Sequence, residues 1–273
     1  MQMTTTDNTI TSGQNPKIKR LLALQQKSSE RRKEGLFVVE GRRELQHCLD
    51  AGYEIDSVFY CPSVLNDQGD DVSTLFQQLP ATTRLFEVSM DVYEKIAYRG
   101  STEGMLAEVK TRQLSLNDLQ LSASPLIIVL ESVEKPGNLG AVLRSADAAQ
   151  ADAVIVCDPK TDLYNPNLIR SSIGAIFTVP CVACSSDSCI EYLQQHGIQI
   201  LTAQLQDSHL YYDTDMRRAT AIVMGTESTG LTDKWRQAAT AHIRIPMLGR
   251  LDSLNVSVSA AILLFEAVRQ RNI

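Results

Sequence analysis

The side chains of this sequence that are best suited to chemistry lie in three polar segments, each of which follows an apolar run. These segments cover residues 134–147, 223–232 and 245–270. They supply an arginine, a carboxylate, amides and hydroxyls, a set that suits a polar ligand carrying negative charge. The candidate catalytic residues are Asn138, Arg144, Glu227, Ser253 and Asn255. The histidines, which are His47, His196, His209 and His242, lie outside these segments, so few groups there resemble a general base.

The first segment, EKPGNLGAVLRSAD, follows the apolar run 125–130 and has the strand–turn–helix outline of a phosphate-binding site. It contains neither G-x-G-x-x-G nor G-x-x-x-x-G-K-[ST], which argues against a nucleotide-dependent oxidoreductase. We expect Asn138 to cap the helix, and Arg144 to stand over a bare surface left by Gly140 and Ala141. The alternative is a capped helix with an arginine that is merely exposed.

The second and third segments join glycines to polar side chains. Gly225 and Gly230 permit tight turns, and the backbone between them could wrap a ligand. Glu227, the only acid in that turn, is either a site residue or the cap of the next helix. Ser253 and Asn255 lie at the start of a long final helix, where unpaired backbone N–H groups favour anions. The alternative role of Ser253 is that of a helix cap alone.

Composition indicates a globular protein, since 44% of the 273 residues are hydrophobic and 21% are charged. The net charge of −6 conceals a basic segment at 15–43, where nine lysines and arginines accompany three glutamates. Such a segment is a possible footprint for nucleic acid, although a solvated helix face also explains it. No apolar stretch approaches the roughly 18 residues of a membrane span, so we expect a cytoplasmic protein without a membrane partner.

The six cysteines lack the density and spacing of a secreted disulfide scaffold. Cys181 and Cys184, with Cys189 nearby, have some likeness to a zinc motif. A structural zinc site has four ligands, however, and His196 is the only histidine close in sequence. We therefore expect thiols in a reducing cytoplasm and no bound metal.

Hydrophobic periodicity divides the chain into two α/β halves. We expect a frayed terminus at 1–15, a first domain at 16–111, a polar linker at 112–124 and a second domain at 125–273. The second domain is predicted to hold strands at 126–130, 153–157, 176–181, 198–203, 220–224 and 242–246, and helices at 139–150, 166–174, 186–196, 232–240 and 255–271. Strands that alternate with helices predict a parallel sheet covered on both faces. The three polar segments then follow the carboxyl ends of strands, where such sheets bind ligands.

These segments, in this order, resemble the three sequence motifs of the SpoU (TrmH-like) RNA 2′-O-ribose methyltransferases, of the SPOUT class. NLGAVLRSA is similar to the first motif, MGTESTGL to the second and IPMLGRLDSLNVSVSAAILLFE to the third. The stretch YNPNLIRSSIGAIFTVP also resembles a segment of the family, with Arg170 at a matching position. The resemblance covers residues 125–273. The first motif has Lys135-Pro136 where the family often has Asp-Pro, which we expect to alter local charge rather than chemistry.

The resemblance implies a C-terminal SPOUT domain whose parallel sheet is flanked by helices and whose chain forms a deep trefoil knot, an exception to the rule that connections do not thread. The N-terminal half, with NPKIKRLLAL and LFVVEGRREL, is similar to the smaller α/β substrate-binding domain of many members, which has an L30e-like fold. This likeness implies that the basic segment contacts RNA. The residues expected to contact RNA are Lys17, Lys19, Arg20, Arg31, Arg32, Arg42, Arg144 and Arg170.

The resemblance also implies S-adenosylmethionine as the cofactor, bent in the knot and held largely by backbone groups. The residues expected to bind it are Thr202, Ala203, Gly225, Ile245, Met247 and Leu254. The family gives the central catalytic role to Arg144, whose guanidinium is almost always protonated and therefore suits phosphate binding or alkoxide stabilisation. Asn138 would orient Arg144 or the ribose, while Ser253 and Asn255 would fix the RNA. Family members are homodimers, which implies a homodimer through the C-terminal domain.

We accordingly expect an S-adenosylmethionine-dependent RNA 2′-O-ribose methyltransferase. Ribosomal RNA is the favoured substrate, and transfer RNA is the second candidate. The alternative from another class is a non-catalytic RNA-binding or ribosome-assembly protein on the same fold. The presence of all five candidate catalytic residues argues against that alternative.

Overall fold

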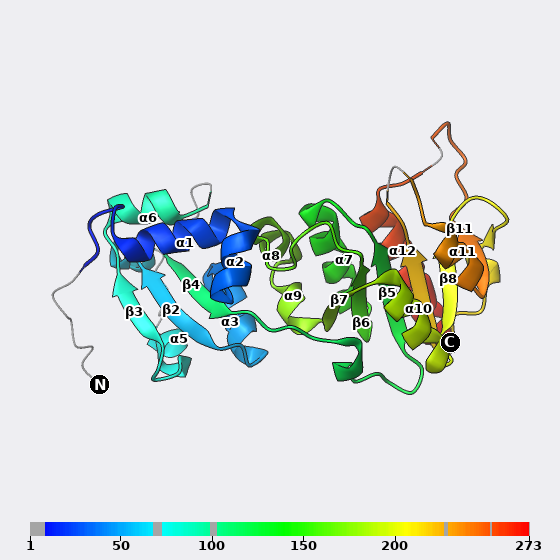
Figure 1. Cartoon of the computed structure of the whole chain (residues 1–273), viewed down its shortest axis with the longest axis horizontal. Coiled ribbons are helices and arrows are strands. Elements are labelled where there is room, and N and C mark those ends of the chain that lie inside the picture. The colour runs from blue at the N-terminus through cyan, green and yellow to red at the C-terminus, as the bar shows by residue number, and fades with distance from the viewer. Residues whose placement is uncertain (1–8, 68–72, 99–102, 227–228, 252, 273) are drawn as a thin grey trace. The chain divides into compact units, whose positions relative to one another are not determined.

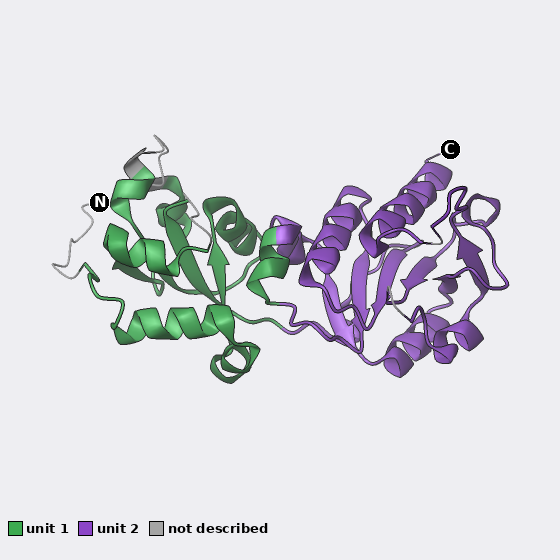
Figure 2. Ribbon diagram, turned by 90° about the horizontal axis from the view of Figure 1, so that it is seen from above, with its two compact units in different colours: residues 1–112, 164–170 green, residues 113–163, 171–273 purple. Residues whose placement is uncertain are grey.

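The computed structural model describes residues 9–67, 73–98, 103–226, 229–251 and 253–272 (Figure 1). The chain divides into two compact units (Figure 2). The first unit comprises residues 1–112 and 164–170, and the second comprises residues 113–163 and 171–273. Within the described ranges, every helix is too short or too polar to cross a lipid bilayer.

The first unit is built on a four-stranded sheet in the order β1-β4-β2-β3. Its strands are β1 (Leu36–Glu40), β2 (Ile55–Tyr60), β3 (Arg84–Glu87) and β4 (Met105–Lys110). Its helices before the second unit are α1 (Pro16–Gln26), α2 (Ser28–Glu34), α3 (Arg42–Asp50), α4 (Pro62–Asp67), α5 (Ser73–Gln78) and α6 (Met90–Ile96). Strand β4 runs antiparallel to β1 and β2, whereas β3 runs parallel to β2, so the sheet is mixed.

Two local sequence signals, Asn15 and Pro16, set the start of helix α1. The Asn15 side chain accepts a hydrogen bond from the backbone nitrogen of Lys17 at 2.9 Å, and Pro16 occupies the first helical position. Ile18, Leu21 and Leu24 then fall on one helical face and are fully buried in the core of the first unit. Lys17 and Lys19 lie off this buried face and are exposed.

The second unit is built on a seven-stranded sheet in the order β7-β6-β5-β10-β8-β11-β9, and all six neighbouring pairs are parallel. Its strands are β5 (Leu126–Glu131), β6 (Ala153–Cys157), β7 (Cys181–Cys184), β8 (Gln199–Ala203), β9 (His209–Leu210), β10 (Thr220–Met224) and β11 (Ala241–Arg244). Its helices are α7 (Pro136–Ala148), α9 (Ala175–Thr178), α10 (Ser186–Gln195), α11 (Asp233–Ala238) and α12 (Val256–Arg271), with 3₁₀ turns at Leu116–Asp118 and Tyr211–Asp213. Helix α8 (Pro166–Ser172) belongs to the first unit as far as residue 170. Every residue of β5, β6 and β10 is buried, as expected for central strands covered on both faces.

Helices cover the two faces of this sheet in pairs. Helix α12 packs beside α7, and α10 packs beside α11 (Figure 1). The core under α10 and α11 contains alternate residues of β5 and β6 together with Leu193 and Trp235, so the other alternate residues face α7 and α12. Leu119 also belongs to this core, and the segment predicted as a linker therefore packs with the second unit.

The predicted fold class is confirmed: the chain has an α/β domain on a parallel sheet and a separate, smaller N-terminal α/β domain. The deep knot stays a prediction. The strand predicted at 176–181 was wrong, because residues 175–178 form α9 and the strand begins at Cys181. A short apolar run such as AIFTV has no periodicity that separates a strand from a helical turn. Gly174, with a φ of 86°, sets the turn that starts this helix.

Candidate active site

The second unit holds a cavity of about 620 Å³ at the carboxyl ends of β10, β8 and β11. These three strands are neighbours in the sheet, so the segments that follow them meet at one edge. The walls come from those segments, from the loop before α12 and from the first turns of α12. Both the position and the volume are typical of small-molecule sites in parallel α/β sheets.

Five of the six predicted cofactor residues line this cavity. They are Ala203, Gly225, Ile245, Met247 and Leu254. Thr202 is not a lining residue, because it is fully buried in β8 with its Oγ1 atom 2.6 Å from Nδ1 of His242, its neighbour on β11. We therefore remove Thr202 from the candidate cofactor contacts and assign it to the pairing of the two strands.

The turn between Gly225 and Gly230 brings two backbone segments into contact at the cavity wall. A Cβ atom added to Gly225 would lie 2.2 Å from the carbonyl carbon of Gly230 and 2.5 Å from the backbone nitrogen of Leu231. Thr226 and Gly230 exchange backbone hydrogen bonds of 3.3 and 3.1 Å, and Gly230 has a φ of 67°. Both glycines are thus required by the geometry, one by the close approach and the other by its backbone conformation.

The candidate residues of the third motif lie at the cavity. Ser253 and Asn255 both line it. Asn255, rather than Ser253, caps α12, since its Oδ1 atom accepts a hydrogen bond from the backbone nitrogen of Ser257 at 2.9 Å. Its Nδ2 atom donates to Oδ1 of Asn138 at 3.2 Å. One asparagine therefore starts the final helix and also joins the first motif to the cavity.

The first motif differs from our expectation at its start. Helix α7 begins at Pro136, which suits the first helical position, and its N-cap is Lys135. Asn138 therefore lies inside the first turn and is not the cap. In this position its side chain accepts the hydrogen bond from Asn255.

Arg144 is exposed on α7 and is not among the residues that line the cavity. Within the described parts of the chain it has no hydrogen-bonding or ion-pair partner. It is six positions after Asn138, so the two side chains leave the helix axis in directions about 120° apart. The surface that we expected Gly140 to leave bare is filled, because a Cβ there would lie 2.8 Å from the backbone nitrogen of Ser172.

The lining of the cavity carries positive charge and little proton-accepting capacity. Arg236 and Arg244 are its charged members, and no Asp, Glu or His is among the described residues that line it. Arg244 donates a hydrogen bond to the carbonyl oxygen of Ser208. Glu227, the predicted acidic member of the site, lies outside the described residues. The described site is thus suited to holding and orienting a ligand rather than to general base catalysis.

Several lining residues were missed by the sequence analysis. They are Gln204, Leu205, Gln206, Met224, Thr226, Thr229, Leu231, Arg236, Ile243, Arg244, Val256, Ser259 and Leu263. Most of them directly follow a strand or begin α12, and the rule that ligands meet the carboxyl ends of parallel strands would have found these. Arg236, on α11, had no signal in the sequence that pointed to the cavity.

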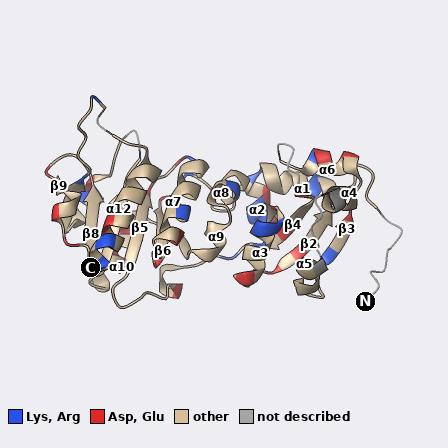
Figure 3. Ribbon diagram, turned by 180° about the vertical axis from the view of Figure 1, so that it is seen from behind, with Lys and Arg blue, Asp and Glu red and all other residues tan. Residues whose placement is uncertain are grey.

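The basic residues of the first unit, whose backbone positions are blue in Figure 3, fall into two groups that differ in the exposure of their side chains. Lys17, Lys19, Arg32 and Arg170 are exposed. Lys17 has its Nζ atom 3.9 Å from the ring centre of Phe86, and Arg170 lies 5.3 Å from that of Tyr98, so both rest on aromatic faces of their own unit. Exposed cations beside aromatic rings are the residue types that RNA-binding surfaces use.

The second group is structural, which corrects part of the predicted RNA contact set. Arg31 is only 3% exposed, and its guanidinium donates to the carbonyl oxygens of Leu24 and Gln25, so it braces the junction of α1 and α2. Arg20 donates to Glu108, a buried carboxylate in β4, and to Asp56 at 3.3 Å. Burial acts to lower the pKa of Arg20, but the hydrogen bond and charge of Glu108 outweigh it and raise that pKa.

Arg42 is intermediate between these two groups, because its side chain is partly exposed and also paired. Its side chain is 25% exposed and its Nε atom lies 4.0 Å from a carboxylate oxygen of Glu103. The backbone nitrogen of Arg42 donates to the same carboxylate at 3.2 Å. This pairing positions Arg42 at the start of α3 and reduces the positive charge it presents to a ligand.

Two family models match the chain. The model described as the SpoU rRNA methylase family matches residues 125–265, and the model described as the MRM3-like substrate-binding domain matches residues 15–107. The 23S rRNA (guanosine-2′-O-)-methyltransferase RlmB of Vibrio cholerae is 34% identical over 234 residues, which cover 82% of this chain and 95% of that protein.

Solved structures resemble the chain over nearly its whole length. An RNA 2′-O ribose methyltransferase is 39% identical, with a TM-score of 0.82, over 97% of this chain and 100% of that one. An AdoMet-bound rRNA methyltransferase from Sinorhizobium meliloti is 29% identical, with a TM-score of 0.85, over 96% of this chain and 97% of that one. The likeness therefore extends over both units.

Proposed function

The chain belongs to the SpoU rRNA methylase family, and we propose that it transfers the methyl group of S-adenosylmethionine to a ribose 2′-hydroxyl of 23S rRNA. The observation that carries this proposal is the cavity at the ends of β8, β10 and β11, to which the second and third motifs both contribute. An enzyme that acts on 23S rRNA would work in the cytoplasm, which is the compartment that we propose.

The cavity suits S-adenosylmethionine in size and lining. Met224, Leu231 and Leu263 offer apolar surface for a nucleoside, and the loops present backbone donors and acceptors at its edges. Arg236 and Arg244 supply the positive charge that a carboxylate requires. When bound, the cofactor supplies an electrophilic methyl group on a sulfonium centre. The proposed contacts are the five predicted residues that line the cavity, without Thr202.

The protein contributes mainly by positioning the ribose hydroxyl. Because no described lining residue is an acid or a histidine, the described site offers no general base. The guanidinium of Arg144 stays protonated, so its proposed role is to hold the target phosphate or to stabilise negative charge that develops on the 2′-oxygen. Asn138 and Asn255, which are hydrogen-bonded to each other, would fix the ribose beside the cavity.

The first unit is the proposed RNA-binding domain. Its exposed cations Lys17, Lys19, Arg32 and Arg170 suit contacts with phosphates, while Arg20 and Arg31 are committed to the fold. The match of this unit to a substrate-binding domain supports the assignment. The domain would thus determine which RNA is bound, and the second unit would perform the transfer.

The second unit is also the proposed site of homodimer formation. Apolar side chains that are large and exposed cluster on the loop before α12 and on α12 itself. They are Leu248, Leu251, Leu254, Val258 and Phe265. Leu248 is 97% exposed and Leu251 is 76% exposed, values that are unfavourable in water unless another surface covers them. A second copy of the chain, related by a two-fold axis, would cover this surface.

Methyl transfer tests the proposal directly. The protein would be incubated with S-adenosylmethionine that is radiolabelled in its methyl group, together with unmodified transcripts of either 23S rRNA or tRNA. Label in 23S rRNA that resists alkaline cleavage of the neighbouring phosphodiester is the expected result. Label in tRNA alone would favour the second candidate substrate. Cofactor binding without label in either RNA would favour the non-catalytic alternative.

A further inference from the structure

Three cysteines bring their sulfur atoms together at a second place in the second unit. Cys157 ends β6, Cys184 ends β7 as its register partner, and Cys189 lies in α10. Their Sγ atoms all lie within 4.8 Å of one another. Cys157 and Cys189 are fully buried, and Cys184 is half-buried. None of the three lines the proposed cofactor cavity.

The spacing of the three sulfur atoms matches that of a metal centre with three thiolate ligands. Atoms no more than 4.8 Å apart lie within about 2.8 Å of a common centre, and zinc–sulfur bonds are about 2.3 Å long. Small rotations of the three side chains would close that difference. Thiolates are the ligands preferred by Zn²⁺ and Cu⁺ among the common cations.

The surroundings of the cysteines favour a cation. Glu131 is the register partner of Cys157 on the next strand and is only 3% exposed. Asp158 directly follows Cys157. Both carboxylates accept hydrogen bonds from the hydroxyl of Ser186, at 3.4 and 2.6 Å, at the start of α10. These bonds orient the carboxylates beside the cluster, and their negative charge attracts a positive ion.

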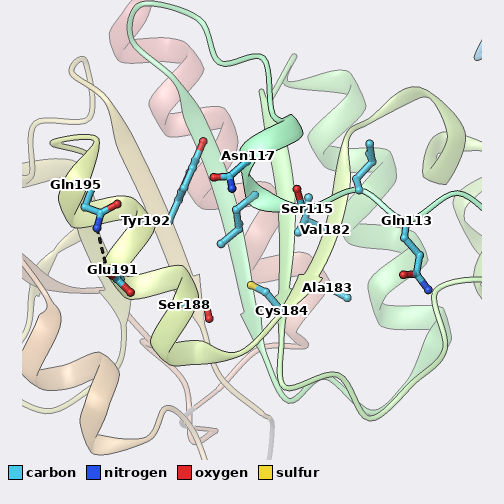
Figure 4. Close-up of a pocket in the computed structure, with 12 residues that line it drawn as sticks. Gln113, Ser115, Asn117, Val182, Ala183, Cys184, Ser188, Glu191, Tyr192 and Gln195 are labelled. Atoms are coloured by element: carbon cyan, nitrogen blue, oxygen red, sulfur yellow. Dashed lines mark hydrogen bonds between the residues drawn. The ribbon is translucent and has the colours of Figure 1, made fainter.

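A path leads from solvent to the cluster. Cys184 lines a pocket of about 650 Å³ together with Ser188, Tyr192 and the segment 113–117, and Figure 4 shows its sulfur atom at the pocket wall. An ion can therefore reach the cysteines through this opening. The same opening admits a water molecule or another small ligand to complete the coordination, as in metal sites with three protein ligands.

We propose that Cys157, Cys184 and Cys189 form a binding site for a thiophilic d¹⁰ metal ion of the Zn²⁺ or Cu⁺ kind. Each thiol releases its proton to solvent as its sulfur forms a bond with the ion. The ion ties the ends of β6 and β7 to α10 on the side of the sheet opposite α7 and α12. This proposal replaces our expectation from sequence that the chain binds no metal.

The sequence pointed to the wrong pair of cysteines. Cys181 and Cys184 are three residues apart, but in a strand this spacing places their side chains on opposite faces of the sheet. Cys157, 27 positions before Cys184, is the true neighbour because the sheet aligns the ends of β6 and β7. Cys181 is therefore a matched control: it lies in the same strand, is buried and is not a member of the cluster.

The experiment measures bound metal, not methyl transfer. The reduced full-length protein is incubated separately with Zn²⁺ and with Cu⁺, passed through a desalting column and analysed by inductively coupled plasma mass spectrometry. We expect about one equivalent of at least one of these ions per chain. Cys189→Ser should retain at least tenfold less of that ion, and Cys181→Ser should retain as much as the wild type.

A second variant and a second measurement keep the test valid if Cys189→Ser fails to fold. Cys184→Ser changes the half-buried member, and circular dichroism checks its fold. In the wild-type protein, the ion should slow alkylation of Cys184 by iodoacetamide at least tenfold, as measured by peptide mass spectrometry. Wild-type protein that retains neither ion would overturn the proposal. Equal retention by the wild type, Cys184→Ser and Cys189→Ser would overturn it as well.

Discussion

The two units of the chain are both α/β layers, yet they place their charged and polar groups differently. The first unit has a mixed sheet of four strands, and it presents separate exposed cations on α1, α2 and α8. The second has seven parallel strands, and its loops enclose a cavity whose charged members, among the described lining residues, are two arginines. An open charged surface suits a polyanion, whereas an enclosed cavity suits a small molecule.

The comparison also shows that counting basic residues overestimates how many are available to bind RNA. Arg20 neutralises the buried Glu108, and Arg31 satisfies backbone carbonyl oxygens at the end of α1. Neither guanidinium is available to a phosphate. In the second unit, Arg144 shows the opposite behaviour, since it has no partner among the described residues. A charged side chain without a structural partner is the stronger functional candidate.

Replacing Arg144 should give the largest effect on activity. We expect Arg144→Ala to reduce kcat for methyl transfer by about 10²–10³-fold, because it removes a positive charge that acts on the transition state. Affinity for S-adenosylmethionine should be unchanged, since Arg144 does not line the cavity. The matched control is Arg217→Ala, an exposed arginine of the same unit that is paired with Asp215. Similar activity of the two variants would contradict the role of Arg144.

Replacing Arg20 should affect stability instead. Arg20→Ala leaves the Glu108 carboxylate buried beside the Ser57 hydroxyl but without its neutralising charge, which we expect to destabilise the first unit by about 2 kcal/mol. Arg84→Ala is the control, because its pair with Asp56 is more exposed and should contribute less than about 1 kcal/mol. Urea unfolding of both variants measures the difference. Equal unfolding free energies would show that the Arg20–Glu108 pair is not structural.

The smallest expected effect concerns RNA affinity. A triple change of Lys17, Lys19 and Arg32 to Gln should weaken RNA binding about tenfold, and its salt dependence should fall by about one unit of slope for each phosphate that is no longer neutralised. Replacing Lys160, Arg217 and Lys234 of the second unit removes the same charge and is the control. Fluorescence anisotropy at several salt concentrations provides both quantities. An equal decrease in affinity in the two triple variants would show that RNA binding depends on net charge alone.

The architecture could be predicted from local sequence patterns, and the family resemblance identified part of the cavity lining. Buried strands such as β5 and the long helix α12 follow directly from apolar runs and helical periodicity, although the cap of α12 is Asn255 and not Ser253. The division of Arg20 and Arg31 from the exposed cations was not predictable, since Glu108 and Gln25 meet them only through the fold. The cysteine cluster required strand register, which a spacing along the chain does not reveal.

Two local signals, Asn138 and Pro136, predict different starts for α7. Asn138 is a favourable N-cap residue, but Pro136 suits the first helical position and moves the start of the helix three residues earlier. The asparagine side chain is therefore hydrogen-bonded to Asn255 instead of capping its own helix. Gly140 likewise serves close packing against Ser171 and Ser172, not a ligand.

Calorimetric titration of S-adenosylmethionine into two glycine variants tests the central claim most directly. Gly225→Ala forces a Cβ atom into the backbone of Gly230 at the cavity wall, whereas at Gly137, on the exposed start of α7, a Cβ atom would meet nothing within 4 Å beyond its chain neighbours and its own helix backbone. We predict that Gly225→Ala weakens binding at least about 100-fold, a loss of about 2.7 kcal/mol, while Gly137→Ala binds as the wild type does. Thermal unfolding verifies that both variants are folded. Wild-type affinity in folded Gly225→Ala would show that the cavity at the ends of β8, β10 and β11 is not the cofactor site.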